Sequence, residues 1–213
     1  RAMDGDGKHS LTRMPTHLDL SLSQDGATPF FVACQFDYRD MAELLMSDTR
    51  IINQPRNDGA SPLYIACHAA HRAVAQLLLL NSADVNKCLK DTNVGPLYIT
   101  AQNGVPELLT QLIEAKANVN ETTSLGIAPL HMACLRGTLS KVKALVEGRA
   151  NVNQVIDEDK STPLLIACSK LRPEIDLVAY LLDSNADINA RLKVYTAKRG
   201  SEAASEAASE RDG

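Results

Sequence analysis

One segment carries every signal of a complete helical hairpin: Ile127-Ala-Pro-Leu-His-Met-Ala-Cys-Leu-Arg-Gly-Thr-Leu-Ser-Lys-Val-Lys-Ala-Leu-Val-Glu-Gly-Arg-Ala-Asn-Val-Asn153. Pro129 suits the first position of a helix, which we expect to end at Arg136, before the Gly137 break. A second helix is predicted through Val146, followed by an extended Asn-Val-Asn. Such a hairpin cannot bury its apolar face alone, so it predicts further copies along the chain.

The copies appear when Pro129 is used as the reference. Prolines recur at intervals of 33 or 34 residues, each followed by an apolar residue and then by an alanine or threonine four positions on. Each unit continues with a second apolar block and closes on an asparagine. Several positions fixed in register over five units indicate a repeat array. The prolines are Pro29, Pro62, Pro96, Pro129 and Pro163, and the asparagines are Asn53, Asn86, Asn120, Asn153 and Asn189.

These residues resemble the ankyrin-repeat family. Asp58-Gly59-Ala60-Ser61-Pro62 matches the opening of its pattern, and Ala83-Asp84-Val85-Asn86 matches the closing. The third unit departs from it, with Asn93-Val94-Gly95 where Asp-Gly-x-Thr is expected. The resemblance implies an all-α fold, a solenoid of stacked helix-turn-helix units with β-hairpin finger loops.

Three segments are expected along the chain. Residues 1–17 form an N-terminal extension, 18–189 the repeat domain, and 190–213 a tail that is basic at first and then rich in Ser-Glu-Ala-Ala. The repeats span approximately 21–53, 54–86, 87–120, 121–153 and 154–189. The alanine-rich tail is read either as a short helix that caps the stack or as a flexible low-complexity segment, and the sequence favours the second. Both ends suggest a segment cut from a longer protein.

Composition argues against several classes of partner. A net charge of -4 provides no electrostatic footprint for nucleic acid, and no apolar run approaches the roughly 18 residues of a membrane helix. Aromatic residues make up only 4% of the chain, so small and aliphatic side chains must form the core. No secretory signal pattern is present, and unpaired thiols favour an intracellular location. We expect this segment to be a monomer.

The cysteines suggest a metal site that their spacing argues against. Cys34, Cys67, Cys134 and Cys168 all lie five residues after a proline, so stacking places them about 9–10 Å apart, too far for a shared metal or a disulfide. We expect all four in a small buried slot, and Cys88 exposed in a finger. No metal or cofactor is predicted.

Catalytic chemistry receives little support. Cys67 and His68 are adjacent, so on a helix they point to different faces and cannot form a nucleophile and base pair. The acidic run from Asp157 to Asp159 is typical of a solvated finger loop, and no glycine-rich phosphate loop occurs. We therefore predict no catalytic residues and no enzyme activity.

The resemblance also implies where a partner would bind. In this family the fingers and first helices line a concave groove that binds a protein or peptide, which predicts a non-catalytic interaction scaffold. The alternative is a regulatory or targeting module of a larger enzyme or channel. Leu125, Ile127 and Leu135 either form an apolar partner patch or pack against neighbouring fingers, and the sequence leaves both open. The groove candidates are Phe31, Phe36, Tyr64, His68, Asp91, Tyr98, Gln102, Leu125, Ile127, His131, Leu135, Arg136, Glu158 and Asp159. Four of them share the position of the motif's histidine, which the family uses for hydrogen bonding between units, so these four either line the groove or bridge units: Phe31, Tyr64, Tyr98 and His131.

Overall fold

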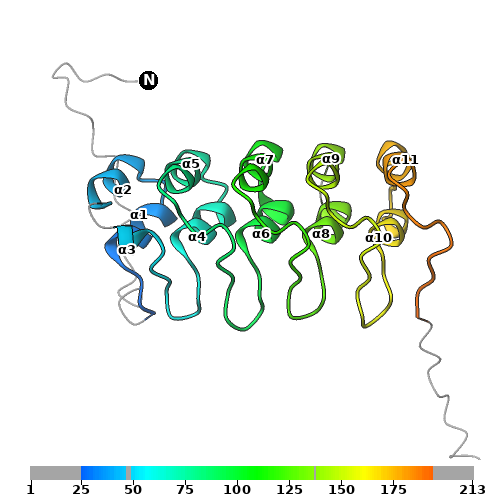
Figure 1. Ribbon diagram of the computed structural model, residues 1–213, viewed down its shortest axis with the longest axis horizontal. Coiled ribbons are helices and arrows are strands. Elements are labelled where there is room, and N and C mark those ends of the chain that lie inside the picture. The colour runs from blue at the N-terminus through cyan, green and yellow to red at the C-terminus, as the bar shows by residue number, and fades with distance from the viewer. Residues whose placement is uncertain (1–24, 47–48, 137, 194–213) are drawn as a thin grey trace, which may run out of the picture.

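The structure, a computed structural model, describes residues 25–46, 49–136 and 138–193. This part of the chain is an elongated stack of helix pairs with loops projecting from one side (Figure 1). Each helix contacts its partner and the helix of the same row in the next pair. The inner row consists of α1 (Pro29–Gln35), α4 (Pro62–His68), α6 (Pro96–Asn103), α8 (Pro129–Arg136) and α10 (Pro163–Ser169). The outer row consists of α2 (Arg39–Leu45), α5 (Arg72–Leu80), α7 (Pro106–Glu114), α9 (Leu139–Glu147) and α11 (Ile175–Asp183), and a short α3 (Thr49–Ile52) follows α2.

Every inner helix begins at its predicted proline. Proline suits the first helical position because it has no backbone N–H, and an N–H at that position would find no intrahelical acceptor. The preceding residue caps the helix in three units: the hydroxyls of Thr28, Ser61 and Thr162 accept a hydrogen bond from the backbone N–H three residues on, at 3.1, 3.0 and 3.3 Å. The helix pair predicted from residues 127–153 is confirmed as α8 and α9. Residues 1–24 and 194–213, and with them the N-terminal extension and most of the tail, lie outside the described residues.

The fingers are hairpin-shaped loops, but no strand occurs in the part of the chain that the structure describes. Two backbone hydrogen bonds close the third finger, from Leu89 N–H to Val94 O at 3.0 Å and from Asn93 N–H to Leu89 O at 3.2 Å. Residues 152–153, expected to be extended, form a turn instead. Each tip contains one residue with positive φ, so the third finger keeps the common turn with asparagine in place of glycine. These tip residues are Gly26, Gly59, Asn93, Gly126 and Lys160.

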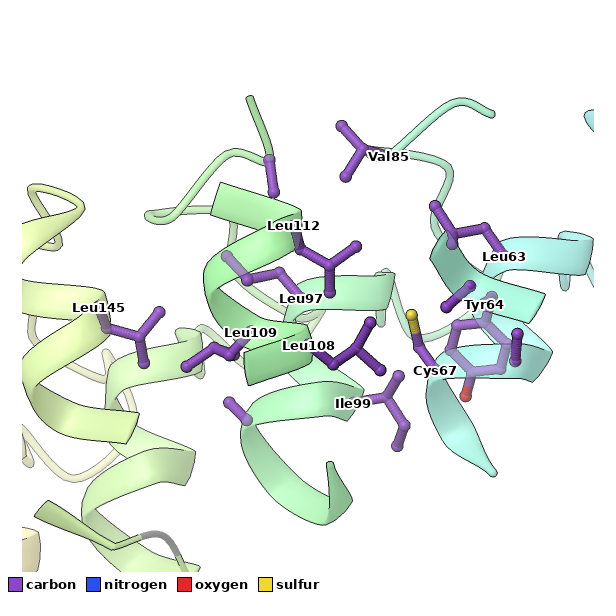
Figure 2. Close-up of a cluster of buried hydrophobic side chains, with 14 of the residues drawn as sticks. Leu63, Tyr64, Cys67, Val85, Leu97, Ile99, Leu108, Leu109, Leu112 and Leu145 are labelled. Atoms are coloured by element: carbon purple, nitrogen blue, oxygen red, sulfur yellow. The ribbon is translucent and has the colours of Figure 1, made fainter. Parts of the chain in front are cut away.

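Small side chains let the inner helices pack closely, and leucines fill the space behind them (Figure 2). Cys34, Cys67 and Cys134 are 0% exposed, as expected, and burial raises the pKa of each thiol to about 12. The prediction for Cys168 is wrong: its side chain is exposed, because no described helix pair follows α10 and α11. Cys88 is half-buried in its finger.

Three groove candidates belong to the core instead. Phe31 is 1% exposed, Tyr64 9% and His131 1%, so the expectation that they line the groove does not hold. All three lie two residues after a proline, and for Phe31 and His131 the next finger covers the side chain. For Phe31 this cover is the guanidinium of Arg56, whose Cζ lies 5.4 Å from the ring centroid.

His131 ties its helix to the following finger. Its Nδ1 accepts a hydrogen bond from Ala128 N–H at 3.0 Å, so its proton resides on Nε2, which donates to Gln154 O at 2.9 Å. Burial lowers the pKa of His131 below its ordinary value of 6.5, against smaller opposing effects of the hydrogen bond to Gln154 and of the charge of Asp159. The buried neutral ring therefore serves as a structural link between units.

The closing asparagines form a ladder along the stack. Asn120 is representative: its Oδ1 accepts from Asn151 N–H at 2.7 Å, and its Nδ2 donates to Arg149 O at 3.4 Å. In the second to fifth units, the residue whose carbonyl accepts from the asparagine Nδ2 has positive φ, and this conformation turns the chain out of the outer helix. The same pair of bonds is made by Asn53 to Asp84 and Ser82, by Asn86 to Asn118 and Lys116, and by Asn153 to Asp187 and Asn185.

A lysine occupies a core position in the fourth unit. Lys141 is 7% exposed and lies where the second, third and fifth units place the buried Val74, Leu108 and Leu177. Its Nζ donates to Ala101 O in the last turn of α6 at 3.1 Å, a carbonyl at the end of a helix that lacks an intrahelical partner. Burial lowers the pKa of Lys141 below 10.5, because the ammonium loses hydration that one hydrogen bond does not replace.

Replacing Asn120 by alanine should lower the free energy of unfolding by about 1 kcal/mol, since it removes both bonds between two units. Urea denaturation followed by circular dichroism measures this change. Gln76→Ala, which removes an exposed amide from α5, is the matched control and should change stability by less than about 0.5 kcal/mol. Equal effects of the two substitutions would show that the ladder contributes nothing specific.

Lys141→Met should raise the free energy of unfolding by about 1 kcal/mol at pH 7, because it removes a charge from an apolar slot and keeps an unbranched side chain only one heavy atom shorter. The folded-state pKa of Lys141 is depressed, so the unfolded chain binds more protons and the wild-type protein gains stability as pH rises toward 10.5. The advantage of the variant should therefore shrink between pH 7 and pH 9.5 in urea titrations. A variant less stable than wild type at pH 7 would mean that the bond to Ala101 outweighs desolvation.

His131 should make the free energy of unfolding decrease as the pH falls. Because its folded-state pKa is depressed, its contribution is present above pH 6.5 and is lost as pH falls below that value, by at most about 1.4 kcal/mol per pH unit. Thermal or urea unfolding of wild type and His131→Gln between pH 7.5 and pH 5 tests this. The variant should start less stable and decline less steeply, whereas His68→Gln should follow wild type. Parallel pH profiles for all three proteins would refute this role.

Candidate functional site: the finger side

The finger side is defined here as the surface formed by the fingers together with the exposed residues of the inner helices. Among the groove candidates, Leu125 is 66% exposed, Leu135 46% and Phe36 37%. Four polar candidates are also exposed, and the remaining four are half-buried. The exposed four are His68, Asp91, Arg136 and Glu158, and the half-buried four are Tyr98, Gln102, Ile127 and Asp159.

The fourth finger holds Leu125 outward by a local hydrogen-bond network. Thr123 Oγ1 accepts from the N–H of Leu125 at 3.3 Å and of Ile127 at 3.2 Å, and Gly126 turns the chain with φ 76. Ser124 N–H donates to Thr92 O at 2.9 Å, which fixes this finger to the preceding one. The apolar tip is therefore presented by a backbone that is ordered before any partner arrives, and this lowers the entropic cost of binding.

Leu135 and Arg136 lie in the last turn of α8. Arg136 comes close enough to Tyr98 of α6 to oppose, by its charge, the rise that burial causes in the tyrosine pKa. A tyrosine and an arginine of two neighbouring units thus lie near each other, and the arginine follows an exposed leucine in the sequence. Tyrosine and arginine beside apolar surface are the combination enriched at protein interfaces.

Other candidates meet in pairs. His68 stacks on the largely buried Tyr64 with ring centroids 6.2 Å apart, so the partly covered tyrosine supports an exposed imidazole. At the C-terminal end of α1, Phe36 stacks on Tyr38 with ring centroids 6.0 Å apart. Tyr38 precedes α2 and was not among our candidates.

The acidic finger residues differ in role. Asp91 is exposed, whereas the carboxylate of Asp159 accepts bonds from Ser161 N–H at 2.9 Å and Ser161 Oγ at 2.6 Å. These bonds lower the pKa of Asp159 and hold the fifth finger's turn. Asp159 therefore shapes the finger, while Asp91 presents its charge to the solvent.

Sequence reasoning missed two residues of this side. The guanidinium of Arg56 pairs with the carboxylate of Asp25 in the first finger, with N and O 3.3 Å apart, and with that of Asp58 in the second. Arg56 thereby joins the first two fingers and lowers the pKa of Asp58. The available signal was an aspartate four residues before the proline in both of the first two units, with Arg56 two residues before the second aspartate. Val155 is 38% exposed in the fifth finger, at the repeat position that carries Cys88 or Glu121 elsewhere, and an apolar residue at a polar position would have indicated it.

A small hollow beside Tyr98, lined also by Cys88 and Asn93, has about 10 Å³ of free volume, room for about one water molecule. Among the residues that the structure describes, no three His, Cys, Asp or Glu side chains gather in a way that could hold a metal ion. In the same part of the chain, no helix is long and apolar enough to cross a bilayer.

Comparison with known families agrees with this geometry. The family described as ankyrin repeats (3 copies) matches residues 8–88 and 97–191, well over half of the chain. No curated protein matches the chain. Ankyrin repeats generally serve as protein-interaction modules and are typically non-catalytic. The repeat register, the paired helices and the fingers all agree with the matched family, and the chain belongs to the ankyrin-repeat family.

Proposed function

We propose that this chain is a non-catalytic scaffold that binds a protein or peptide partner on its finger side, within an intracellular compartment. The observation that supports this most strongly is the exposure of Leu125 and Leu135, 66% and 46%, in a single unit. Leucines that face water gain free energy when a partner covers them, roughly 25 cal/mol for each Å² of apolar surface buried. The ordered fourth finger presents one of the two.

The polar residues around the leucines would set orientation. Arg136 follows the exposed Leu135 in α8 and lies near Tyr98, and Asp91 is exposed in the neighbouring finger. Charges at the rim of an interface chiefly affect association rate and selectivity, while the apolar centre supplies most of the affinity. The arrangement favours a partner segment with apolar anchors flanked by a carboxylate facing Arg136.

A second candidate function keeps the same surface but changes its context. The chain could act as the regulatory or targeting module of a larger enzyme or channel, with the finger side contacting that larger protein's other parts. The family match supports an interaction role in either case. The two functions differ in whether the bound segment belongs to a separate protein.

Leu125→Asp with Leu135→Asp should weaken partner binding by about 10-fold or more, because two carboxylates would be buried without partners. Ile127 is left unchanged, since it is half-buried and its backbone closes the finger. Affinity capture with quantitative mass spectrometry, followed by titration of the purified captured protein, measures the loss.

The matched control is Leu44→Asp with Leu80→Asp, the same change at leucines of the outer helices that are 81% and 76% exposed. It should retain the partners that the finger-side variant loses, provided that circular dichroism shows both to be folded. If both variants keep every partner, the finger side is not the binding surface. If only the outer-helix variant loses them, binding belongs to the opposite side.

A further inference from the structure

The fifth unit carries an apolar hollow on the surface that faces away from the fourth. It encloses about 230 Å³ and is lined by residues of both helices of the unit and of the segment that follows them. Most of the lining is aliphatic. The residues used below are Leu165 and Cys168 of α10, Val178 and Leu182 of α11, and Ile188.

Earlier units bury the equivalent surface against the next unit. Cys168 is exposed, whereas Cys67 and Cys134 at the same repeat position are 0% exposed. Ile188 is 73% exposed, whereas Val85 and Val119 at its position are 8% and 9% exposed. Among the described residues, nothing covers the face of the fifth unit that corresponds to the face through which the other units stack.

The chain leaves this unit along the path that a sixth finger would take. Lys193 N–H donates to Asp159 O in the fifth finger at 2.8 Å. Lys90 N–H makes the same bond to Asp58 O at 3.1 Å, and in both cases the donor lies four residues after the closing asparagine. The last described residue thus already follows the repeat register and directs the chain toward the open face.

The sequence beyond Lys193 suits the vacant position. Inner helices begin nine or ten residues after a closing asparagine, as from Asn120 to Pro129 and from Asn153 to Pro163. Ten residues after Asn189 is position 199, and Ser201-Glu-Ala-Ala-Ser-Glu-Ala-Ala begins two residues later. Alanine is the strongest helix former, and its pairs here match in size the Ala-Cys pairs by which inner helices approach one another.

We propose that residues 194–213 dock on this face, with the alanine-rich stretch lying where the inner helix of a sixth unit would lie and covering Cys168, Leu165 and Ile188. An isolated helix of about ten residues is marginal in water, so the apolar face would supply the missing stabilisation. Attachment at Lys193 raises the effective concentration of the segment to about the millimolar range, which favours it over a free competitor.

Cys168 provides a direct probe of this docking. N-ethylmaleimide modifies only an accessible thiol, and peptide mapping separates Cys168 from Cys88, which lies in a distant finger and serves as an internal control. In the full chain, Ala203→Asp with Ala207→Asp places two charges on the packing side of the alanine-rich stretch. This variant should be modified at Cys168 about 10-fold faster than wild type, while Cys88 reacts at an unchanged rate.

The matched control is Ser205→Asp with Ser209→Asp, which adds the same charge to the side of such a helix that faces away from the alanine pairs. Its Cys168 should react as slowly as in wild type. Equal rates in wild type and the alanine variant would overturn the proposal. So would protection that increases with protein concentration together with a doubled mass in light scattering, because a second copy would then cover the face.

Discussion

The structure depends on one constraint: a pair of helices seven to nine residues long cannot bury its own apolar side. Each unit therefore relies on the next, and the contact is close because alanine and cysteine occupy the facing positions of the inner helices. Leu108, Leu109 and Leu112 of α7 reach 0% exposure only because a neighbouring unit covers them on either side. Stability in such an array is a sum of intrinsic and nearest-neighbour terms, so an uncovered end is its weakest point.

This constraint explains how much the sequence could predict. The five prolines located every inner helix, because a proline at the first helical position and a small residue four positions later follow from local backbone chemistry and close packing. The fate of individual side chains was harder to anticipate. Phe31, Tyr64 and His131 share a repeat position for which the resemblance left two places open, the groove or a bridge between units, and the structure buries all three. The burial of Phe31 and His131 depends on tertiary contacts with Arg56 and Gln154, and the local pattern does not identify these partners.

Cys168 illustrates the same limit from the other side. Its position in the repeat predicted burial, but burial of that slot is a property of two units, and no described pair follows the fifth. Lys141 was likewise hidden within an apolar-periodic helix, since one charged residue hardly alters the pattern. Its contact with Ala101 joins residues forty positions apart. The departure at Asn93 mattered less than expected, because asparagine adopts the left-handed conformation that the finger tip requires.

In the proposed scaffold, stacking and binding use separate surfaces. The asparagine ladder and the buried positions of the inner helices join the units. The finger tips and the last turns of the inner helices are then available to a partner. The most direct test is hydrogen–deuterium exchange of the chain with and without a purified binding protein. We predict slower exchange in residues 121–127 and in the last turn of α8 on binding, with the outer helices unchanged. Slowing confined to α5, α7 and α9 would contradict the assignment of the finger side as the binding surface.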